Sequence, residues 1–150
     1  MRPQFVSAAI AILALVACSG PPEQSALIRI TELEAWPPGD FGTTLHLAMT
    51  FTNRSGGIID DVEFDAHAYD AAGERVHDGL SRPIENLSTG GPIGPGEQAS
   101  HAWSLDFDNP TVACFVLTRV TVVRRSGLVQ RYATPEALAS IMAVPNVCPR

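Results

Sequence analysis

Two observations on the sequence predict an all-β fold. Apolar and polar residues alternate with a period of two over several segments, which is the pattern of strands with one buried face. Turn-forming residues separate these segments about every 8–12 residues, and no helical pattern lies between them, which argues against a βαβ fold. The sequence therefore predicts an antiparallel β-sandwich of immunoglobulin-like type, with about seven strands and a short C-terminal helix. An eight-stranded barrel is the alternative.

The expected strands follow in order along the chain. Residues 27–33 are rich in β-formers and lead to Trp36, and residues 43–53 alternate strictly. Residues 62–69 alternate again, a short strand follows at 74–77, and the alternation returns over 98–107. Residues 114–125 form the strongest strand, and Ser126-Gly127 turns it into a last strand at 128–132. The buried face of the 43–53 strand is predicted to carry Leu45, Leu47, Met49 and Phe51. His46 is predicted on the opposite face.

Turn chemistry explains the connections. Asn53, Gly56 and Gly57 tolerate positive φ at the end of a hairpin. Asp70 can accept backbone N–H groups across its own turn. Residues 80–96 are rich in proline and glycine and are expected to form a long, mobile connection.

A short helix is expected near the end of the chain. Thr134 can cap it, Pro135 suits its first turn, residues 136–143 fill it, and Pro145 stops it.

The N-terminal residues predict an export signal. Residues 5–17 are uncharged and apolar, about 20 Å of helix, which is too short to span a ~30 Å hydrocarbon core. Leu15-Val16-Ala17-Cys18 then resembles the lipobox of bacterial lipoproteins, and the resemblance implies that Cys18 is acylated and becomes the mature N-terminus. An ordinary secretory signal is the alternative. The chain is thus expected to divide into a signal peptide (1–17), an acylated cysteine with a short tether (18–26) and one domain (27–150).

The lipoprotein resemblance also implies a location. The protein is expected in the cell envelope, attached to a membrane through its N-terminal lipid. Ser19, rather than Asp, after the cysteine favours the outer membrane, facing the periplasm.

The remaining cysteines form an even set. If lipid takes Cys18, then Cys114 and Cys148 are left, and an even count in an exported protein predicts a disulfide. Closing this loop of about 35 residues stabilises a fold by roughly 3.8 kcal/mol in the chain-entropy model. A reactive or metal-binding thiol pair is the alternative.

Composition and motifs argue against several functions. Loss of Arg2 with the signal leaves nine basic against 16 acidic residues, a formal charge of −7, without a basic stripe; nucleic-acid binding is not expected. Gly-x-Ser-x-Gly, Ser-x-x-Lys, His-Glu-x-x-His and phosphate-loop motifs are absent, so no catalytic residue and no cofactor is assigned. A hydrolase with an unmarked site remains open, because a triad is defined by geometry.

Metal binding is the second functional hypothesis. His46 and His67 lie opposite the apolar faces of their strands and could meet if those strands pair, but no metal ligand set is assigned. His77 and His101 are isolated. Two acidic clusters could hold Ca²⁺, but charged strand edges and loop tips are the simpler interpretation. The clusters are Asp60, Asp61, Glu63 and Asp65, and Asp106, Asp108 and Asn109.

Three short segments resemble the FxLYD-type family of immunoglobulin-like modules of secreted and lipid-anchored bacterial proteins. They are Phe51-Thr52-Asn53-Arg54-Ser55-Gly56, Ala68-Tyr69-Asp70-Ala71-Ala72-Gly73 and Ile93-Gly94-Pro95-Gly96-Glu97. The family's Phe and Leu fall on Ala66 and Ala68 here. The resemblance covers about residues 43–107 and implies the sandwich fold without catalytic residues. We therefore expect a non-catalytic envelope protein that binds or assembles with a protein partner, through an exposed sheet edge or the 80–96 connection.

Overall fold

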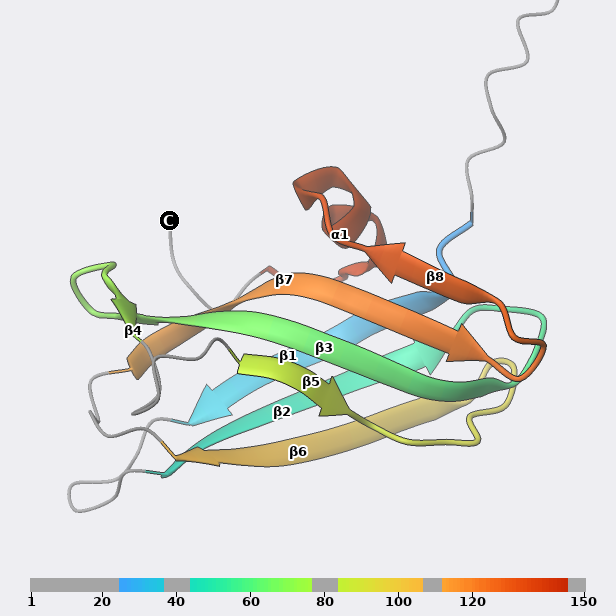
Figure 1. Cartoon of the computed structure of the whole chain (residues 1–150), viewed down its shortest axis with the longest axis horizontal. Helices are drawn as coiled ribbons and strands as arrows, with labels where there is room; N and C mark the ends of the chain where they lie inside the picture. The colour runs from blue at the N-terminus through green and yellow to red at the C-terminus, as the bar shows by residue number, and fades with distance from the viewer. Residues whose placement is uncertain (1–24, 37–43, 77–83, 107–111, 146–150) are drawn as a thin grey trace, which may run out of the picture.

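The computed structural model describes residues 25–36, 44–76, 84–106 and 112–145 (Figure 1). Within these ranges, no helix combines the length and the apolar character needed to cross a membrane.

Eight strands and one helix make up the described chain. They are β1 (Ile28–Trp36), β2 (Thr44–Asn53), β3 (Ile59–Asp70), β4 (Arg75–Val76), β5 (Ile84–Ser88), β6 (Gln98–Asp106), β7 (Val112–Arg124), β8 (Val129–Tyr132) and α1 (Pro135–Ile141). One sheet has the order β1-β2-β6. The other has the order β4-β3-β7-β8, with β5 also pairing with β3.

All named strand pairs are antiparallel. The chain crosses from the first sheet to the second after β2, returns with β6 and crosses again with β7, which is the Greek-key connectivity of immunoglobulin-like sandwiches (Figure 1). The predicted sandwich with a short C-terminal helix is confirmed, with eight described strands rather than about seven. The barrel alternative is wrong, because no described strand joins the two sheets.

The inner faces of the two sheets form the core. The four apolar side chains predicted on one face of β2 are each at most 1% exposed. Phe51 of β2 meets Phe64 of β3 across the sandwich, with ring centroids 5.9 Å apart. Alternation along β2 therefore identifies its buried face correctly.

Different elements close the two open sides of the sandwich. On one side α1 inserts Leu138 and Ile141 into the core, and the Ala143 N–H donates to the Ile30 carbonyl of β1 over 2.8 Å. The predicted cap is present, since the Ala137 N–H donates to Thr134 Oγ1 over 3.2 Å. On the other side the Trp103 indole packs edge-on against Phe64.

The turn after β2 is held by a buried side chain. Asn53 is 0% exposed. Its Nδ2 donates to the carbonyls of Gly57, Ile93 and Gly94 over 2.9–3.0 Å, and its Oδ1 accepts from Ser55 N and Ser55 Oγ. The expectation that positive φ explains this turn is wrong, because neither Asn53, Gly56 nor Gly57 has a positive φ.

The long connection expected over residues 80–96 contains structure. Residues 84–88 form β5, and Ile93 exchanges two backbone hydrogen bonds with Ile59, of 2.8 and 3.0 Å. Ile93 is buried, so this segment is fixed to the start of β3. The strand β5 was not expected within this connection, and it forms because tertiary pairing outweighs the local proline and glycine signals.

Candidate interaction surfaces

The outer edge of β6 is the longest uncovered strand edge in the described structure. β6 pairs only with β2, and the register runs without a shift from Thr44↔Asp106 to Thr52↔Gln98. Every second residue of such a strand directs its backbone N–H and C=O toward the open side. The strand therefore offers a nine-residue template for another strand.

Natural proteins protect sheet edges with charge, proline, bulges or short length. β6 has none of these over its central seven residues, and its one charged residue is Asp106 at the end. The other edges differ. β8 is four residues long, and β4 and β5 have two and five residues. β1 has a register shift and accepts the Ala143 N–H, and α1 lies beside the part of β7 that β8 leaves unpaired. β6 is thus the edge best suited to strand addition.

The side chains of β6 divide between two faces. Ala99, Trp103 and Leu105 pack against the core, while the opposite face carries small polar or apolar residues, Ser100, Ala102 and Ser104. The predicted facing of Trp103 and Leu105 is confirmed. Phe107, expected to continue this face, lies outside the described residues.

Trp103 is the largest side chain at this edge. Its Nε1 donates to the Ser88 carbonyl over 3.1 Å, which links β6 to the end of β5 in the other sheet. The ring of His101 lies beside it, with a centroid distance of 4.8 Å. His101 is exposed and Trp103 is half-buried, so an aromatic pair borders the uncovered edge.

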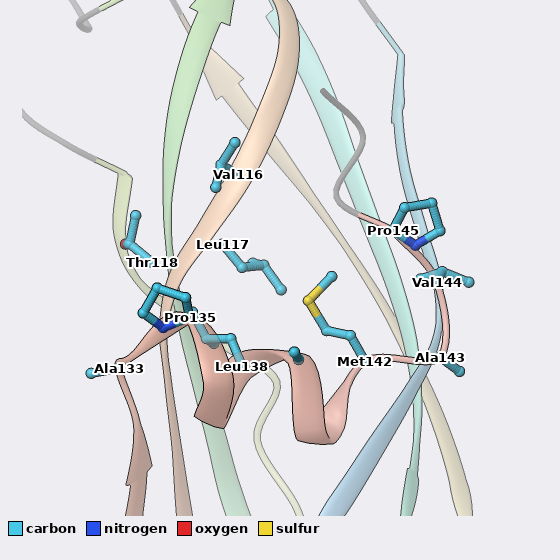
Figure 2. Close-up of a pocket in the computed structure, with 11 residues that line it drawn as sticks. Val116, Leu117, Thr118, Ala133, Pro135, Leu138, Met142, Ala143, Val144 and Pro145 are labelled. Atoms are coloured by element: carbon cyan, nitrogen blue, oxygen red, sulfur yellow. The ribbon is translucent and has the colours of Figure 1, made fainter. Parts of the chain in front are cut away.

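An apolar groove lies between α1 and β7. β8 pairs only with residues 120–123 of β7, so the first half of β7 has no partner strand on that side. α1 folds over the space beside it and leaves a cavity of about 660 Å³. Leu117 and Met142 point toward one another across it (Figure 2). Its lining contains no charged side chain and ends at Val144 and Pro145.

A second hollow adjoins the groove on the outer face of the larger sheet. It measures about 490 Å³ and is lined by residues that include Tyr69, Cys114 and Val116. Val116 also lines the groove, so the two hollows are neighbours. Cys114 is 7% exposed and stands opposite Tyr69 in the β3–β7 register.

His46 and His67, which could have shared a metal if their strands paired, do not meet. β2 and β3 belong to different sheets, and both His46 and His67 point away from the core of their own sheet. They therefore lie on opposite outer faces of the sandwich, so the condition for a shared site is not met. His46 instead bonds Ser104 Oγ through Nδ1 over 3.1 Å. No group of three or more histidine, cysteine or acidic side chains suited to a metal occurs among the described residues.

The first acidic cluster is engaged in local contacts. Asp60 pairs with Arg125 over 2.8 Å, and Asp61 accepts from Ser88 Oγ and Gly90 N. These contacts fix the start of β3 to the residue after β7 and to the end of β5.

Asp65 has two partners. It forms an ion pair with Arg119 and accepts from the Asn86 N–H over 2.9 Å. Asn86 is the one described non-glycine residue with a positive φ, 57°. Asp65 thereby links β3 to β5 and β7.

The Asp70 turn forms as predicted. Its Oδ1 accepts from the N–H groups of Ala72 and Glu74 over 2.9 and 2.8 Å. Of the second acidic cluster, Asp106 accepts from Thr44 Oγ1 over 2.7 Å. Asp108 and Asn109 lie outside the described residues.

Two other predicted sites lie outside the described residues. These are Cys18, with the whole N-terminal segment 1–24, and Cys148. His77 also falls outside them.

The positions of the β6 edge and of the groove beside α1 could not be predicted from the sequence. An exposed edge was expected, but which strand carries it depends on pairing between distant segments. The groove depends on how far β8 extends along β7. The one local signal was the absence of charge and proline from residues 99–105.

No protein-family model matches the sequence, and no curated protein matches it. Among solved structures, the chain resembles SoR45, a structural-genomics target, with a TM-score of 0.49 and 16% identity over 73% of this chain and 88% of that one. It also resembles part of a β-glucosidase from Listeria innocua in complex with gluconolactone, with a TM-score of 0.33 and 17% identity. That match covers 69% of this chain and 15% of the glucosidase, so only a small part of the enzyme is matched.

Proposed function

We propose that this chain is a non-catalytic, lipid-anchored protein of the bacterial cell envelope that binds a protein partner by strand addition to β6. The observation that carries this proposal is the uninterrupted nine-residue outer edge of β6. In strand addition, main-chain hydrogen bonds supply affinity and alternate side chains supply specificity. Trp103 and His101 border the edge, and large aromatic side chains are frequent anchors of interfaces.

The proposed anchor is an acylated Cys18. Two or three fatty chains, at ~0.8 kcal/mol per buried CH₂, hold a protein far more firmly than one chain. Leu27 is fixed in the fold, since its N–H donates to the Tyr132 hydroxyl over 2.9 Å. The eight residues between Cys18 and Leu27 reach at most about 30 Å, so the sandwich would stand close to the membrane, as proposed the outer membrane on its periplasmic side.

Membrane fractionation with mass spectrometry of the mature N-terminus tests this anchor. We expect an acylated Cys18 in the membrane fraction and its loss from that fraction in Cys18→Ala. An unmodified mature chain that starts elsewhere contradicts it.

We also propose a Cys114–Cys148 disulfide. Pro145 and Val116 line the same groove, and Val116 shares the neighbouring hollow with Cys114. The described chain therefore ends on the groove that leads to Cys114, three residues before Cys148. Peptide mapping without reduction should yield one linked pair of peptides, and two freely alkylated thiols would contradict the pairing.

The proposed binding edge is tested by site-specific photo-crosslinking in membranes. A photoreactive residue replaces Ala102, which is exposed at the centre of β6, and a matched control replaces Arg131, which is exposed on the other edge strand, β8. We expect adducts of discrete mass from position 102 and none from position 131. No adduct from position 102, or equal adducts from both, contradicts the proposal.

A further inference from the structure

We infer that the partner of the β6 edge is the β6 edge of a second copy of this chain, paired antiparallel about a twofold axis at Ala102. This inference rests on the proposed function of that edge and names its partner. Such an interface is isologous, because the same patch serves both copies. The two three-stranded sheets would join into one six-stranded sheet.

The register follows from the length of the strand. A twofold axis that passes beside one residue of a strand places that residue opposite its own copy. A residue n positions before it then lies opposite the partner's residue n positions after it. Ala102 is the midpoint of Gln98–Asp106, so it is the one centre that pairs all nine residues. Residues directly opposite one another in an antiparallel pair share a face, so the inner and outer faces of the two sheets remain continuous.

The outer-face side chains are compatible in this register. Ala102 meets the partner's Ala102, which allows close approach. Ser100 meets the partner's Ser104, so two hydroxyl groups stand opposite each other. Asp106, the one charge of the strand, meets the amide of the partner's Gln98 rather than another carboxylate.

The inner-face side chains are matched as well. His101 stands opposite the partner's Trp103, and because the axis is twofold this pair occurs twice. Within one chain these two rings already lie 4.8 Å apart, so the dimer would bring together four rings, two from each chain. They would lie on the inner face of the joined sheet, where Trp103 contacts the end of β5. Aromatic pairs stabilise an interface beyond the effect of the area that they bury. The exposed part of the Trp103 indole would be partly buried against the partner's His101.

The distribution of charge also permits self-association. The chain is acidic overall, and two acidic chains repel each other. The acidic run of β3, however, lies in the other sheet, where Asp65 is paired with Arg119 and Asp60 with Arg125. The central seven residues of β6 carry no formal charge with histidine neutral, so no like charges oppose each other at the contact.

One paired strand makes a small interface. Stable complexes bury about 1,200–2,000 Å² in total, more than the pairing of two nine-residue strands supplies. The dimer is therefore expected to be weak in dilute solution and to form where the chain is concentrated on a membrane. A trapping experiment on the full chain in its membrane fraction suits such a contact.

The test uses single cysteines on β6 and mild oxidation, in the full chain with its own N-terminal segment. Ala102→Cys faces itself across the axis, with Cβ atoms about 4.5–5.5 Å apart, which is close to the reach of a disulfide. Ser100→Cys stands opposite the partner's Ser104. The partner's own position 100 lies four residues further along the strand, about 13 Å away, which is too far for a disulfide. The control is Val129→Cys, exposed on the other edge strand.

Three results together are expected. Ala102→Cys gives at least about tenfold more disulfide-linked dimer than Val129→Cys, since facing thiols have an effective concentration in the millimolar range. Ser100→Cys alone gives no more than the control. Chains carrying Ser100→Cys, when coexpressed with chains carrying Ser104→Cys, form the mixed dimer.

A charge swap provides an independent check that leaves the native cysteines alone. Ala102→Lys and Ala102→Glu each place like charges opposite each other and should abolish photo-crosslinking from position 104, while their coexpression restores it.

The outcomes separate the two proposals. If Ala102→Cys links no better than Val129→Cys, and the photo-adduct from position 102 has the mass of a different protein, the inference of a second copy is wrong and the binding edge stands. If position 102 gives no adduct at all, both are wrong. An adduct of twice the chain mass, with the cysteine pattern above, supports both.

Discussion

Replacement of Asn53 by alanine should destabilise the domain more than any other single change in the turn between β2 and β3. The side chain is fully buried and joins the turn at 53–57 to residues 93 and 94, some 40 positions later. Truncation removes five hydrogen bonds, three donated and two accepted. The two hydrogens of Nδ2 serve three carbonyls, so these bonds count as about four full ones.

The expected loss follows from what remains after truncation. Each of the three carbonyls keeps a second donor: Ser55 Oγ for Gly57, Ile59 N for Ile93 and Glu97 N for Gly94. The Ser55 N–H has no other partner among the described contacts. Four bonds at about 1 kcal/mol each, with a small penalty for the orphaned amide, give a loss of about 3–5 kcal/mol. That is a large part of the 5–15 kcal/mol typical of a folded domain.

Equilibrium urea unfolding, followed by tryptophan fluorescence and far-UV circular dichroism, measures this loss. Thr52→Ala is the matched control, because Thr52 is the neighbouring residue and its side chain makes no described hydrogen bond; we expect a change below about 1 kcal/mol. Asn53→Asp should lose at least as much as Asn53→Ala at pH 7, since it directs a buried carboxylate at three carbonyl oxygens. A loss below about 1 kcal/mol in Asn53→Ala would refute this account of the turn.

Three further changes have defined outcomes. Burial raises the pKa of Tyr132 above its ordinary value of 10.0, against the smaller lowering by the Leu27 N–H, so its contribution to stability is complete below pH 10 and is lost as pH rises toward the folded pKa. Tyr132→Phe should therefore cost about 1–2 kcal/mol at pH 7 and flatten the alkaline decline of about 1.4 kcal/mol per pH unit; an unchanged slope in alkaline urea titrations argues against it. Gly91→Ala would bring a Cβ within 2.5 Å of the Asp60 carbonyl oxygen, a backbone atom that cannot move without distorting β3. We expect the free energy of unfolding, measured by chemical denaturation, to fall by more than about 2 kcal/mol. An unchanged free energy of unfolding contradicts the close approach. Thr134→Ala removes the cap of α1 and should cost about 1 kcal/mol in the same assay, whereas Thr134→Ser should restore most of it.

Local patterns predicted the elements that depend on neighbouring residues. The buried face of β2 follows from alternation alone, and α1 begins at Pro135 behind Thr134 because capping and proline geometry act within one turn. The Asp70 turn is local in the same way, and its hydrogen bonds reach no further than Glu74. Such features need no knowledge of the rest of the chain.

Features that depend on distant pairing were not predicted. His46 and His67 lie on adjacent strands of the sequence, but β2 and β3 enter different sheets. The bonds of Asn53 need carbonyls 40 residues away, so its sequence neighbourhood suggested only a turn. β5 was hidden because its pairing with β3 outweighs the proline and glycine signals around it. For the same reason an exposed edge could be expected from the sequence, while its assignment to β6 required the sheet order.

The fixation of Leu27 has a mechanical consequence. Its N–H is bonded to the Tyr132 hydroxyl of the larger sheet, and its carbonyl accepts from the Arg54 N–H just after β2 in the smaller one. A pull applied to the chain before residue 27 thus loads both sheets at once, instead of peeling β1 from β2 one bond at a time. Force on the proposed N-terminal anchor would therefore be shared between the two sheets. Force spectroscopy of Tyr132→Phe should reveal a lower rupture force than the unchanged chain when the chain is pulled from its N-terminus.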